Sequence, residues 1–341
     1  MLQKPLVGLE FNEIQSIVHD LGMPKFATKQ IASWLYNKRV NSIDEMTNLS
    51  LKHRDLLKSN FILGLQPPVK SVVSSDGTIK YLFQVGDQSF VEAVYIPDGE
   101  RATLCVSSQV GCKMNCEFCM TGKQGFTKNL SATEMLNQVF SIPERDKLTN
   151  LVLMGMGEPL DNLDEVLKFL NIMTSEYGCA WSPRRITVST VGIRGKLERF
   201  INESECHLAI SIHSAVPELR ARMMPAEKAY PIEEMVEDLK KYDFSKQRRL
   251  SFEYIVFNDL NDSTLYAQRL VELLRGLPCR VNLIRYHAIP EIDLDGVSDE
   301  RMLDFRDYLT SQGLFSTIRS SRGEDVFAAC GMLSTDKKNK E

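Results

Sequence analysis

The chain has 341 residues, of which 43% are hydrophobic and 25% are charged, proportions that are typical of a globular protein and exclude general disorder. Its 41 Lys and Arg residues and 45 Asp and Glu residues give a net charge of −4, so composition alone does not indicate a nucleic-acid partner, although a local basic patch can act within an acidic whole. Neither a run of about eighteen apolar residues nor a signal-peptide core is present, and we therefore expect a cytoplasmic protein with no membrane partner.

Residues 1–62 are expected to form a helical module. Apolar residues recur at helical spacing within 11–21, 28–36 and 49–57, the pattern of amphipathic helices. Residues 63–100 differ, because short runs of β-branched and aromatic residues are separated by Gly-containing turns. This second pattern predicts a small antiparallel β connector.

From residue 101 to 335, strand and helix patterns alternate. A Ser131/Glu134 capping box is predicted to open the first helix, and Asn162 with Glu165 predicts a second one. Six strand–helix units favour an α/β fold with a parallel sheet. Because a closed barrel has eight units, we expect a partial (β/α)6 barrel, followed by a frayed tail at 336–341. The strands are predicted at 102–108, 150–156, 185–191, 207–213, 250–257 and 280–286.

Three of the eight cysteines lie close together after the first predicted barrel strand. Cys112, Cys116 and Cys119 have the spacing C-x3-C-x2-C. Unrelated buried thiols and a zinc site in a non-enzymatic RNA-binding module are two alternatives, but structural zinc takes four protein ligands and no second Cys pair or nearby His is visible. Three cysteines suit a [4Fe–4S] cluster better, since they leave one iron open to a small molecule. Reductive cleavage of S-adenosylmethionine (SAM) needs such an open iron.

Further motifs accompany this cluster motif. They are Asp44–Thr47, Ser75–Lys80, Val94–Pro97, Arg101–Cys119, Gly155–Pro159, Ser211–His213 and Arg322–Gly331. In these segments the chain resembles the radical SAM methyltransferases that act on carbon 2 of adenine in 23S ribosomal RNA and transfer RNA. The resemblance implies a radical SAM barrel in residues 101–335 that ends in a catalytic-cysteine loop, preceded by an RNA-recognition module in residues 1–62.

The resemblance also implies a two-stage reaction that uses one [4Fe–4S] cluster, held by the three cysteines, and consumes two SAM molecules per methyl transfer. One SAM would methylate Cys330. The second would be cleaved to a radical that takes a hydrogen from this methyl group, so that the carbon adds to the RNA in a transient protein–RNA adduct. Glu92 would then accept the proton of carbon 2, and Cys105 would release the product by forming a transient disulfide with Cys330.

Several residues at the ends of predicted strands match the SAM contacts of that family. They are Gly157, Glu158, Ser189, Ser211, Ile212, His213 and His287. His287 is a departure, because the family often has Asn at this position in a Pro-Trp-Asn context. Imidazole can still donate or accept a hydrogen bond there.

The implied substrates are an adenosine of the 2503 type in 23S rRNA and one of the 37 type in tRNA. The implied electron donor is a flavodoxin or a ferredoxin, and we expect a monomer. Basic residues on loops near the predicted active face and on the helical module are candidates for phosphate contacts. They are Lys25, Lys29, Lys38, Arg39, Lys123, Lys128, Arg184, Arg185 and Arg194.

One alternative within the same chemistry is methylation of carbon 8 of the same rRNA adenosine, which confers antibiotic resistance. That branch typically reads Gly-Met-Gly-Glu-Ala, whereas this chain has Pro159 after Glu158. The sequence therefore favours carbon 2.

Overall fold

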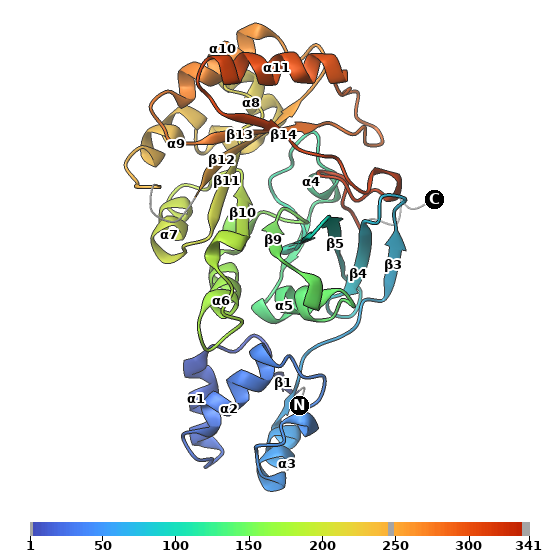
Figure 1. Ribbon diagram of the computed structural model, residues 1–341, viewed down its shortest axis with the longest axis vertical. Helices are drawn as coiled ribbons and strands as arrows, with labels where there is room; N and C mark the ends of the chain where they lie inside the picture. Colours follow the sequence, from blue (N-terminus) through green and yellow to red (C-terminus); the bar gives the residue numbers. More distant parts are fainter. Residues whose placement is uncertain (1–2, 245–248, 336–341) are drawn as a thin grey trace.

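The computed structural model describes residues 3–244 and 249–335, so the tail expected at 336–341 lies outside the described residues. The N-terminal helices form a lobe that extends from the α/β body (Figure 1). A short parallel strand pair, which the sequence did not predict, joins the two ends of this lobe, because Lys4 pairs with Phe61. The lobe comprises β1 (Lys4–Pro5), α1 (Phe11–Asp20), α2 (Ala27–Ala32), a π-helical turn (Ser33–Asn37), a 3-10 turn (Ile43–Glu45), α3 (Leu51–Asn60) and β2 (Phe61–Ile62).

One mixed sheet runs through the remainder of the described chain, in the order β14-β13-β12-β11-β10-β9-β6-β5-β4-β3. The strands from β6 to β14 in this sheet pair in parallel, and the sheet stays open, which confirms the expected open α/β barrel. Its strands are β3 (Lys70–Val73), β4 (Ile79–Gln84), β5 (Phe90–Asp98), β6 (Arg101–Cys105), β9 (Asn150–Leu153), β10 (Ile186–Thr190), β11 (His207–Ser211), β12 (Leu250–Val256), β13 (Arg280–Arg285) and β14 (Ser316–Ile318).

All six predicted barrel strands are present, and a seventh parallel strand, β14, was missed. It pairs with β13 over only three positions, too short a stretch for a period-two pattern to appear. The strands expected as a connector are antiparallel, as predicted. They extend the main sheet, because β5 pairs with β6 along five positions.

Helices follow the parallel strands and cover the sheet (Figure 1). They are α5 (Ala132–Phe140), α6 (Leu163–Thr174), α7 (Lys196–Glu203), α8 (Pro217–Met223), α9 (Ile232–Leu239), α10 (Thr264–Leu274) and α11 (Asp299–Ser311). Short 3-10 turns lie at Arg145–Lys147, Pro159–Asn162, Pro183–Arg185, Pro225–Lys228 and Glu324–Val326. Among the described residues, no helix is long and apolar enough to cross a membrane.

The capping prediction was right for one helix and wrong for another. Ser131 and Glu134 form the predicted capping box at the start of α5. Asn162 does not cap α6, because its side-chain amide donates to the backbone carbonyls of Ser108 and Leu130 at 3.0 and 2.7 Å. Glu165 instead accepts from the backbone N–H of Ala132 at 2.7 Å. Buried backbone groups need hydrogen-bond partners. The need to satisfy the buried carbonyls of Ser108 and Leu130 therefore overrides the local capping pattern of Asn162 and Glu165.

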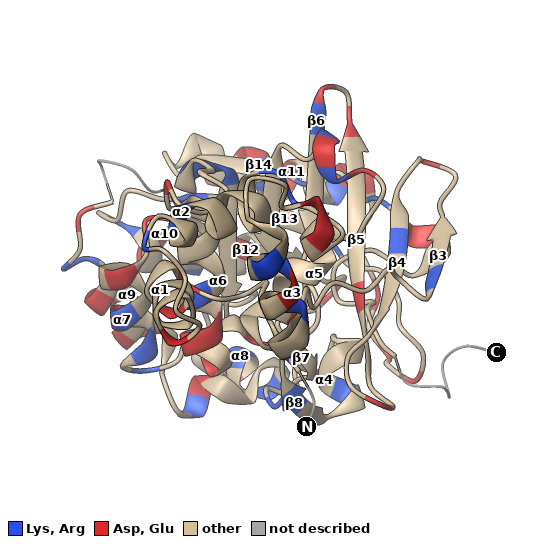
Figure 2. Cartoon of the chain, turned by 90° about the horizontal axis from the view of Figure 1, so that it is seen from below, with Lys and Arg blue, Asp and Glu red and all other residues tan. Residues whose placement is uncertain are grey.

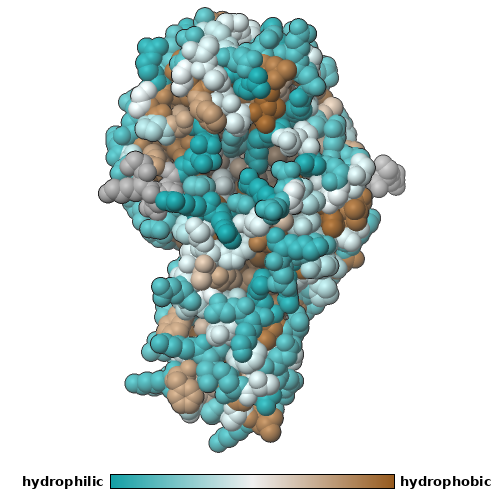
Figure 3. All heavy atoms as spheres, viewed as in Figure 1, coloured by the Kyte–Doolittle hydropathy of each residue, from teal (hydrophilic) through white to brown (hydrophobic). Residues whose placement is uncertain are grey.

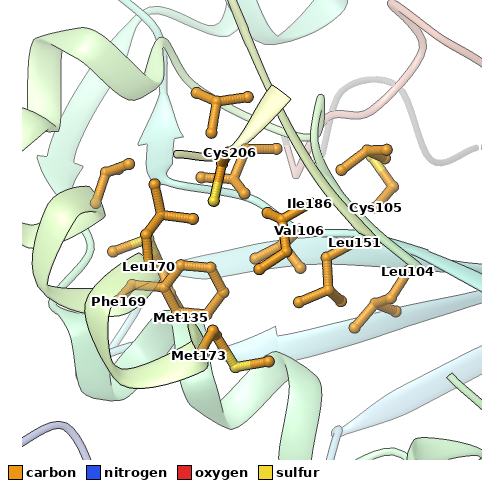
Figure 4. Packing of buried hydrophobic residues seen from close by; sticks show 14 of the residues in the cluster. Leu104, Cys105, Val106, Met135, Leu151, Phe169, Leu170, Met173, Ile186 and Cys206 are labelled. Atoms are coloured by element: carbon orange, nitrogen blue, oxygen red, sulfur yellow. The ribbon is translucent and has the colours of Figure 1, made fainter. Parts of the chain in front are cut away.

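The core lies between the sheet and these helices. Figure 4 shows Leu104, Leu151 and Ile186 of the strands packed towards Met135 of α5 and Phe169 of α6. Each such buried side chain contributes about 1.5–3 kcal/mol relative to exposure. This packing fixes the strands, and so fixes the loops at their carboxyl ends, where ligands of parallel α/β folds bind.

Candidate active site

The three clustered cysteines lie in a tight loop between β7 (Gln109–Gly111) and α4 (Met120–Gln124). The loop closes on the strand that follows it, β8 (Phe126–Asn129). Gly111 has φ +73°, and a Cβ there would lie 1.6 Å from the carbonyl oxygen of Gly125. Only glycine allows this approach. The backbone N–H of Cys112 then donates to the same carbonyl at 2.9 Å, which holds the loop closed.

The thiols of Cys112, Cys116 and Cys119 line one pocket at the carboxyl ends of the parallel strands. Burial raises the pKa of Cys112 to about 12, so the metal-free thiol is protonated at neutral pH and metal binding would displace its proton. Within residues 3–244 and 249–335, no three His, Cys, Asp or Glu side chains converge tightly enough to hold one metal ion. A single zinc ion needs all its ligand atoms about 2 Å away. The described side chains therefore form no ready-made single-ion site.

Glu158 lies in the same pocket, in the loop between β9 and the 3-10 turn Pro159–Asn162, and its carboxylate is hydrogen-bonded within the protein. It accepts hydrogen bonds from the backbone N–H groups of Leu160 and Val191, both at 2.9 Å, and from the Thr190 hydroxyl at 2.5 Å. Burial raises the pKa of Glu158 to about 7. Gly157 beside it is required, because a Cβ would lie 2.6 Å from the side chain of Gln109. The pair thus braces the strand ends around the pocket.

Ser189 of β10 and Ser211 of β11 are neighbours at the pocket, with their hydroxyl oxygens 3.4 Å apart. Ile212 is completely buried and its side chain packs in the core, so only its backbone lies near the site. His213 has φ +52° and lines the pocket. Its Nδ1 accepts from the backbone N–H of Ile255 at 3.0 Å, and burial lowers its pKa to about 3, which keeps the ring neutral.

His287 lies apart from the other predicted SAM contacts. It lines an adjoining cavity with Cys330. Its Nε2 is 2.8 Å from the Ser321 hydroxyl and its Nδ1 is 3.1 Å from the Glu324 carboxylate. Both ring nitrogens therefore hold the segment before Cys330, and a SAM contact by His287 stays a prediction.

Cys330 is the predicted catalytic residue that the fold brings to the three clustered cysteines. It lines their pocket, and the next residue, Gly331, accepts from the backbone N–H of Met120 at 2.8 Å, directly after Cys119. Cys105 ends β6 and is buried, and burial raises its pKa to about 12. The charge of Cys330 raises that pKa further.

Glu92, the predicted base, is not in the pocket of Cys330. It lies on β5, is buried, and lines a separate cavity of about 260 Å³ with Lys80, Phe327 and Ser334. The loop around Cys330 separates this cavity from the cysteine pocket. Cys330 and Gly331 line the cysteine pocket, whereas Phe327, Met332 and Ser334 of the same loop line the cavity that contains Glu92.

Two charged residues of this region were not predicted as site residues. Arg319 lies 3.3 Å from the Glu253 carboxylate and donates to the Met154 sulfur at 3.1 Å. Lys80 lies 3.2 Å from Glu92. Lys80 belongs to the motif Ser75–Lys80, but no local pattern indicated that Glu92 would be its partner. Arg319 had no signal, because β14 before it was not recognised.

The basic candidates outside the N-terminal lobe fall at two different ends of the sheet. Lys123 and Arg194 follow strands or the cysteine loop, on the side of the pocket. Arg184 and Arg185 precede β10, and Arg184 lines a cavity at the amino ends of the strands. The prediction that they lie near the active face is wrong, because the residues before a parallel strand emerge at the opposite edge from those after it.

Several other candidates already have partners. Arg194 pairs with Glu234 at 2.5 Å, Lys128 with Glu134 and Arg39 with Asp146, both at 2.7 Å, and Lys38 lies over the Trp34 ring. Figure 2 shows basic and acidic residues interspersed over the view from below, and Figure 3 shows a hydrophilic face hollowed in the middle of the body.

Comparison with family models matches two parts of the chain. Residues 106–267 match the radical SAM superfamily. Residues 4–63 match the N-terminal domain of ribosomal RNA large subunit methyltransferases. A crystal structure of a radical SAM methyltransferase from Sphaerobacter thermophilus is 37% identical, with a TM-score of 0.92, over 98% of this chain and 100% of that chain.

Curated relatives extend the similarity over nearly the whole chain. A probable dual-specificity RNA methyltransferase RlmN of Bacteroides fragilis is 69% identical, over 99% of this chain and 98% of the relative. The dual-specificity RNA methyltransferase RlmN of Syntrophus aciditrophicus is 40% identical, over 96% and 95%. These similarities exclude the non-enzymatic zinc module. The chain therefore belongs to the dual-specificity RNA methyltransferases RlmN, radical SAM enzymes that methylate RNA.

Proposed function

We propose that the enzyme methylates carbon 2 of adenosine, at a site of the 2503 type in 23S rRNA and of the 37 type in tRNA. The observation that carries this proposal is that Cys330 lines the same pocket as Cys112, Cys116 and Cys119. A methyl-bearing cysteine and a radical source must lie within reach of each other for hydrogen to pass between them. The relatives' names, which describe two RNA specificities, support RNA as the substrate class.

Membership of the radical SAM superfamily implies SAM and a [4Fe–4S] cluster. The thiolates of Cys112, Cys116 and Cys119 would hold one cluster, and Gly157, Ser189, Ser211 and the backbone of Ile212 and His213 would contact SAM. When bound, the cluster would pass an electron to SAM, and SAM would supply the 5′-deoxyadenosyl radical that activates a methyl group on Cys330. A flavodoxin or ferredoxin would supply the electron to a monomeric, cytoplasmic enzyme.

The chain's own residues would perform the remaining steps. Cys330 is exposed, and Ala328, Ala329 and Gly331 around it give a substrate base room to approach its sulfur. Glu92 would accept the proton of carbon 2 once the loop that separates its cavity from the Cys330 pocket has moved aside. Cys105, after losing its proton, would attack the Cys330 sulfur as a thiolate. The S–S bond would form as the bond between that sulfur and the transferred carbon breaks, and the carbon would keep the electron pair and take up a proton to become the methyl group of the released RNA.

Mapping the modified atom tests this function. RNA methylated by the purified enzyme, with its cluster reconstituted, should carry its methyl on carbon 2 when examined by mass spectrometry and NMR. A methyl on carbon 8 would contradict the proposal. A C330A variant is the control, since it should retain the iron absorbance and transfer no methyl to RNA.

A further inference from the structure

The hairpin of β3 and β4 contacts the loop that bears Cys330 at several points. Asp76 accepts from the backbone N–H of Gly323 at 2.8 Å. Asp325 accepts from the Ser74 hydroxyl at 2.5 Å and from the backbone N–H of Ser75 at 3.0 Å. These are charge-assisted hydrogen bonds, stronger than neutral ones. The motif Ser75–Lys80 and its flank therefore form the surface on which the loop lies.

The fit of loop against hairpin is close. Gly323 has φ +66°, and a Cβ there would lie 2.8 Å from Ala328 and 2.9 Å from the methyl group of Thr78. Phe327 has φ +52°, a conformation that is unusual for an aromatic residue. Its carbonyl accepts from the Lys80 ammonium at 3.2 Å. The loop is thus held in a strained conformation by contacts to the hairpin.

Lys80 also contacts the proposed base. Leu82 on β4 lies opposite Glu92 on β5, so Lys80 is the diagonal neighbour of Glu92 on the same face. Its ammonium nitrogen is 3.2 Å from Glu92 Oε1, and the side chains of Lys80 and Glu92 are 15% and 3% exposed. A buried carboxylate stays charged only when it is paired, and only the charged form can accept a proton.

The other carboxylate oxygen of Glu92 contacts the far side of the loop. Oε2 accepts from the backbone N–H of Ser334 at 3.1 Å. Residues on both sides of Cys330 are therefore linked to one carboxylate, through Lys80 to Phe327 and directly to Ser334. The contacts that Lys80 and Ser334 make with Glu92 therefore join this carboxylate to the loop on both sides of Cys330.

We propose that Lys80 is a positioning residue that keeps Glu92 charged and oriented, while the Asp76 and Asp325 contacts hold the Cys330 loop in place. This rests on the proposed function. In the step affected, the bond between carbon 2 and hydrogen breaks, the proton moves to a Glu92 oxygen and the bonding pair stays in the ring, whose unpaired electron from the radical addition would pass to the oxidised cluster. Without the Lys80 contact, methylation of Cys330 and attachment to RNA proceed, but the attached RNA is not released.

The test compares full-length K80M, K80R, E92Q and D325N enzymes, reconstituted with cluster and given SAM and a substrate RNA transcript. Intact mass reports the methyl on Cys330, and a denaturing gel reports the covalent protein–RNA adduct. K80M should keep Cys330 methylation within about twofold of wild type and accumulate adduct at least about tenfold, as E92Q does. K80R retains a cation and should release most of the RNA.

D325N is the matched control, because Asp325 anchors the same loop without touching Glu92. It should lower Cys330 methylation and adduct formation together, with no accumulation of adduct. If K80M behaves like D325N, or turns over like wild type while E92Q accumulates adduct, the role of Lys80 is refuted. If wild type places no methyl on Cys330 or on RNA, the proposed function itself fails, which is a separable result.

Discussion

Arg319 and Glu253 form an ion pair, 3.3 Å apart, between the pocket at the carboxyl ends of the parallel strands and the cavity at their amino ends. Glu253 has a side chain that is only 4% exposed, whereas that of Arg319 is 34% exposed. Glu253 also accepts from the Asn282 amide at 2.7 Å. The ion pair therefore lies between the pocket at the carboxyl ends of the strands and the cavity at their amino ends, and it separates the two.

Replacing Arg319 should destabilise the fold. R319M leaves the Glu253 carboxylate buried beside an apolar side chain, and an uncompensated buried charge costs about 3–5 kcal/mol. Because Arg319 is partly exposed to the cavity, we expect about 2–3 kcal/mol, measured as the free energy of unfolding in urea. The double variant R319M/E253Q removes the unpaired charge and should recover most of the loss. Equal destabilisation in both variants would show that packing, and not charge, is responsible.

His213 should make stability depend on pH. Burial lowers its pKa from 6.5 to about 3 in the folded protein, so the unfolded chain takes up the proton first as the pH falls. The share of the folding stability that depends on a neutral His213 is present above pH 6.5 and is lost as the pH falls towards 3. Between pH 6.5 and 4.5 this amounts to about 2–3 kcal/mol.

Asn tolerates the positive φ of position 213, so H213N is the matched variant. Its unfolding free energy, measured in urea over the same pH range, should fall less steeply than that of wild type. Parallel slopes for the two proteins would rule out His213 as the titrating group.

Removing a cluster cysteine should abolish the first methylation as well as the second. C112A enzyme, purified without oxygen from cells, should lack the iron absorbance and carry no methyl on Cys330 by intact mass. C279A alters a half-buried thiol that lines no part of the pocket and should retain both signals. Methylated Cys330 in the C112A protein would separate the first stage from the cluster and contradict the scheme.

Charge reversal at the carboxyl ends of the parallel strands should weaken RNA binding more than charge reversal at their amino ends. K123E reverses an exposed charge on α4, next to Cys119, and should weaken RNA binding and reduce the salt dependence of the affinity by about one phosphate contact. R185E makes the same charge change at the opposite ends of the strands and should leave both quantities within about twofold. A larger effect of R185E, with iron absorbance intact, would place the RNA at the other end.

The sequence determined the parts that depend on local pattern. Spacing alone assigned Cys112, Cys116 and Cys119 to one loop, and the alternation of strand and helix patterns predicted the open α/β sheet. Ser131 and Glu134 could be recognised as a capping box, since all four residues of that motif are contiguous. Such features form from neighbours in the chain, so a one-dimensional pattern contains them.

Only the tertiary structure decided which distant residues meet. Lys80 and Glu92 are brought together by the register of β4 on β5, and Arg319 and Glu253 by two strands that are far apart in sequence. The same packing gave Asn162 buried carbonyls to satisfy and moved Arg184 to the far edge of the sheet. These outcomes follow from burial and from the pairing of polar groups across the fold, interactions whose partners no local pattern specifies.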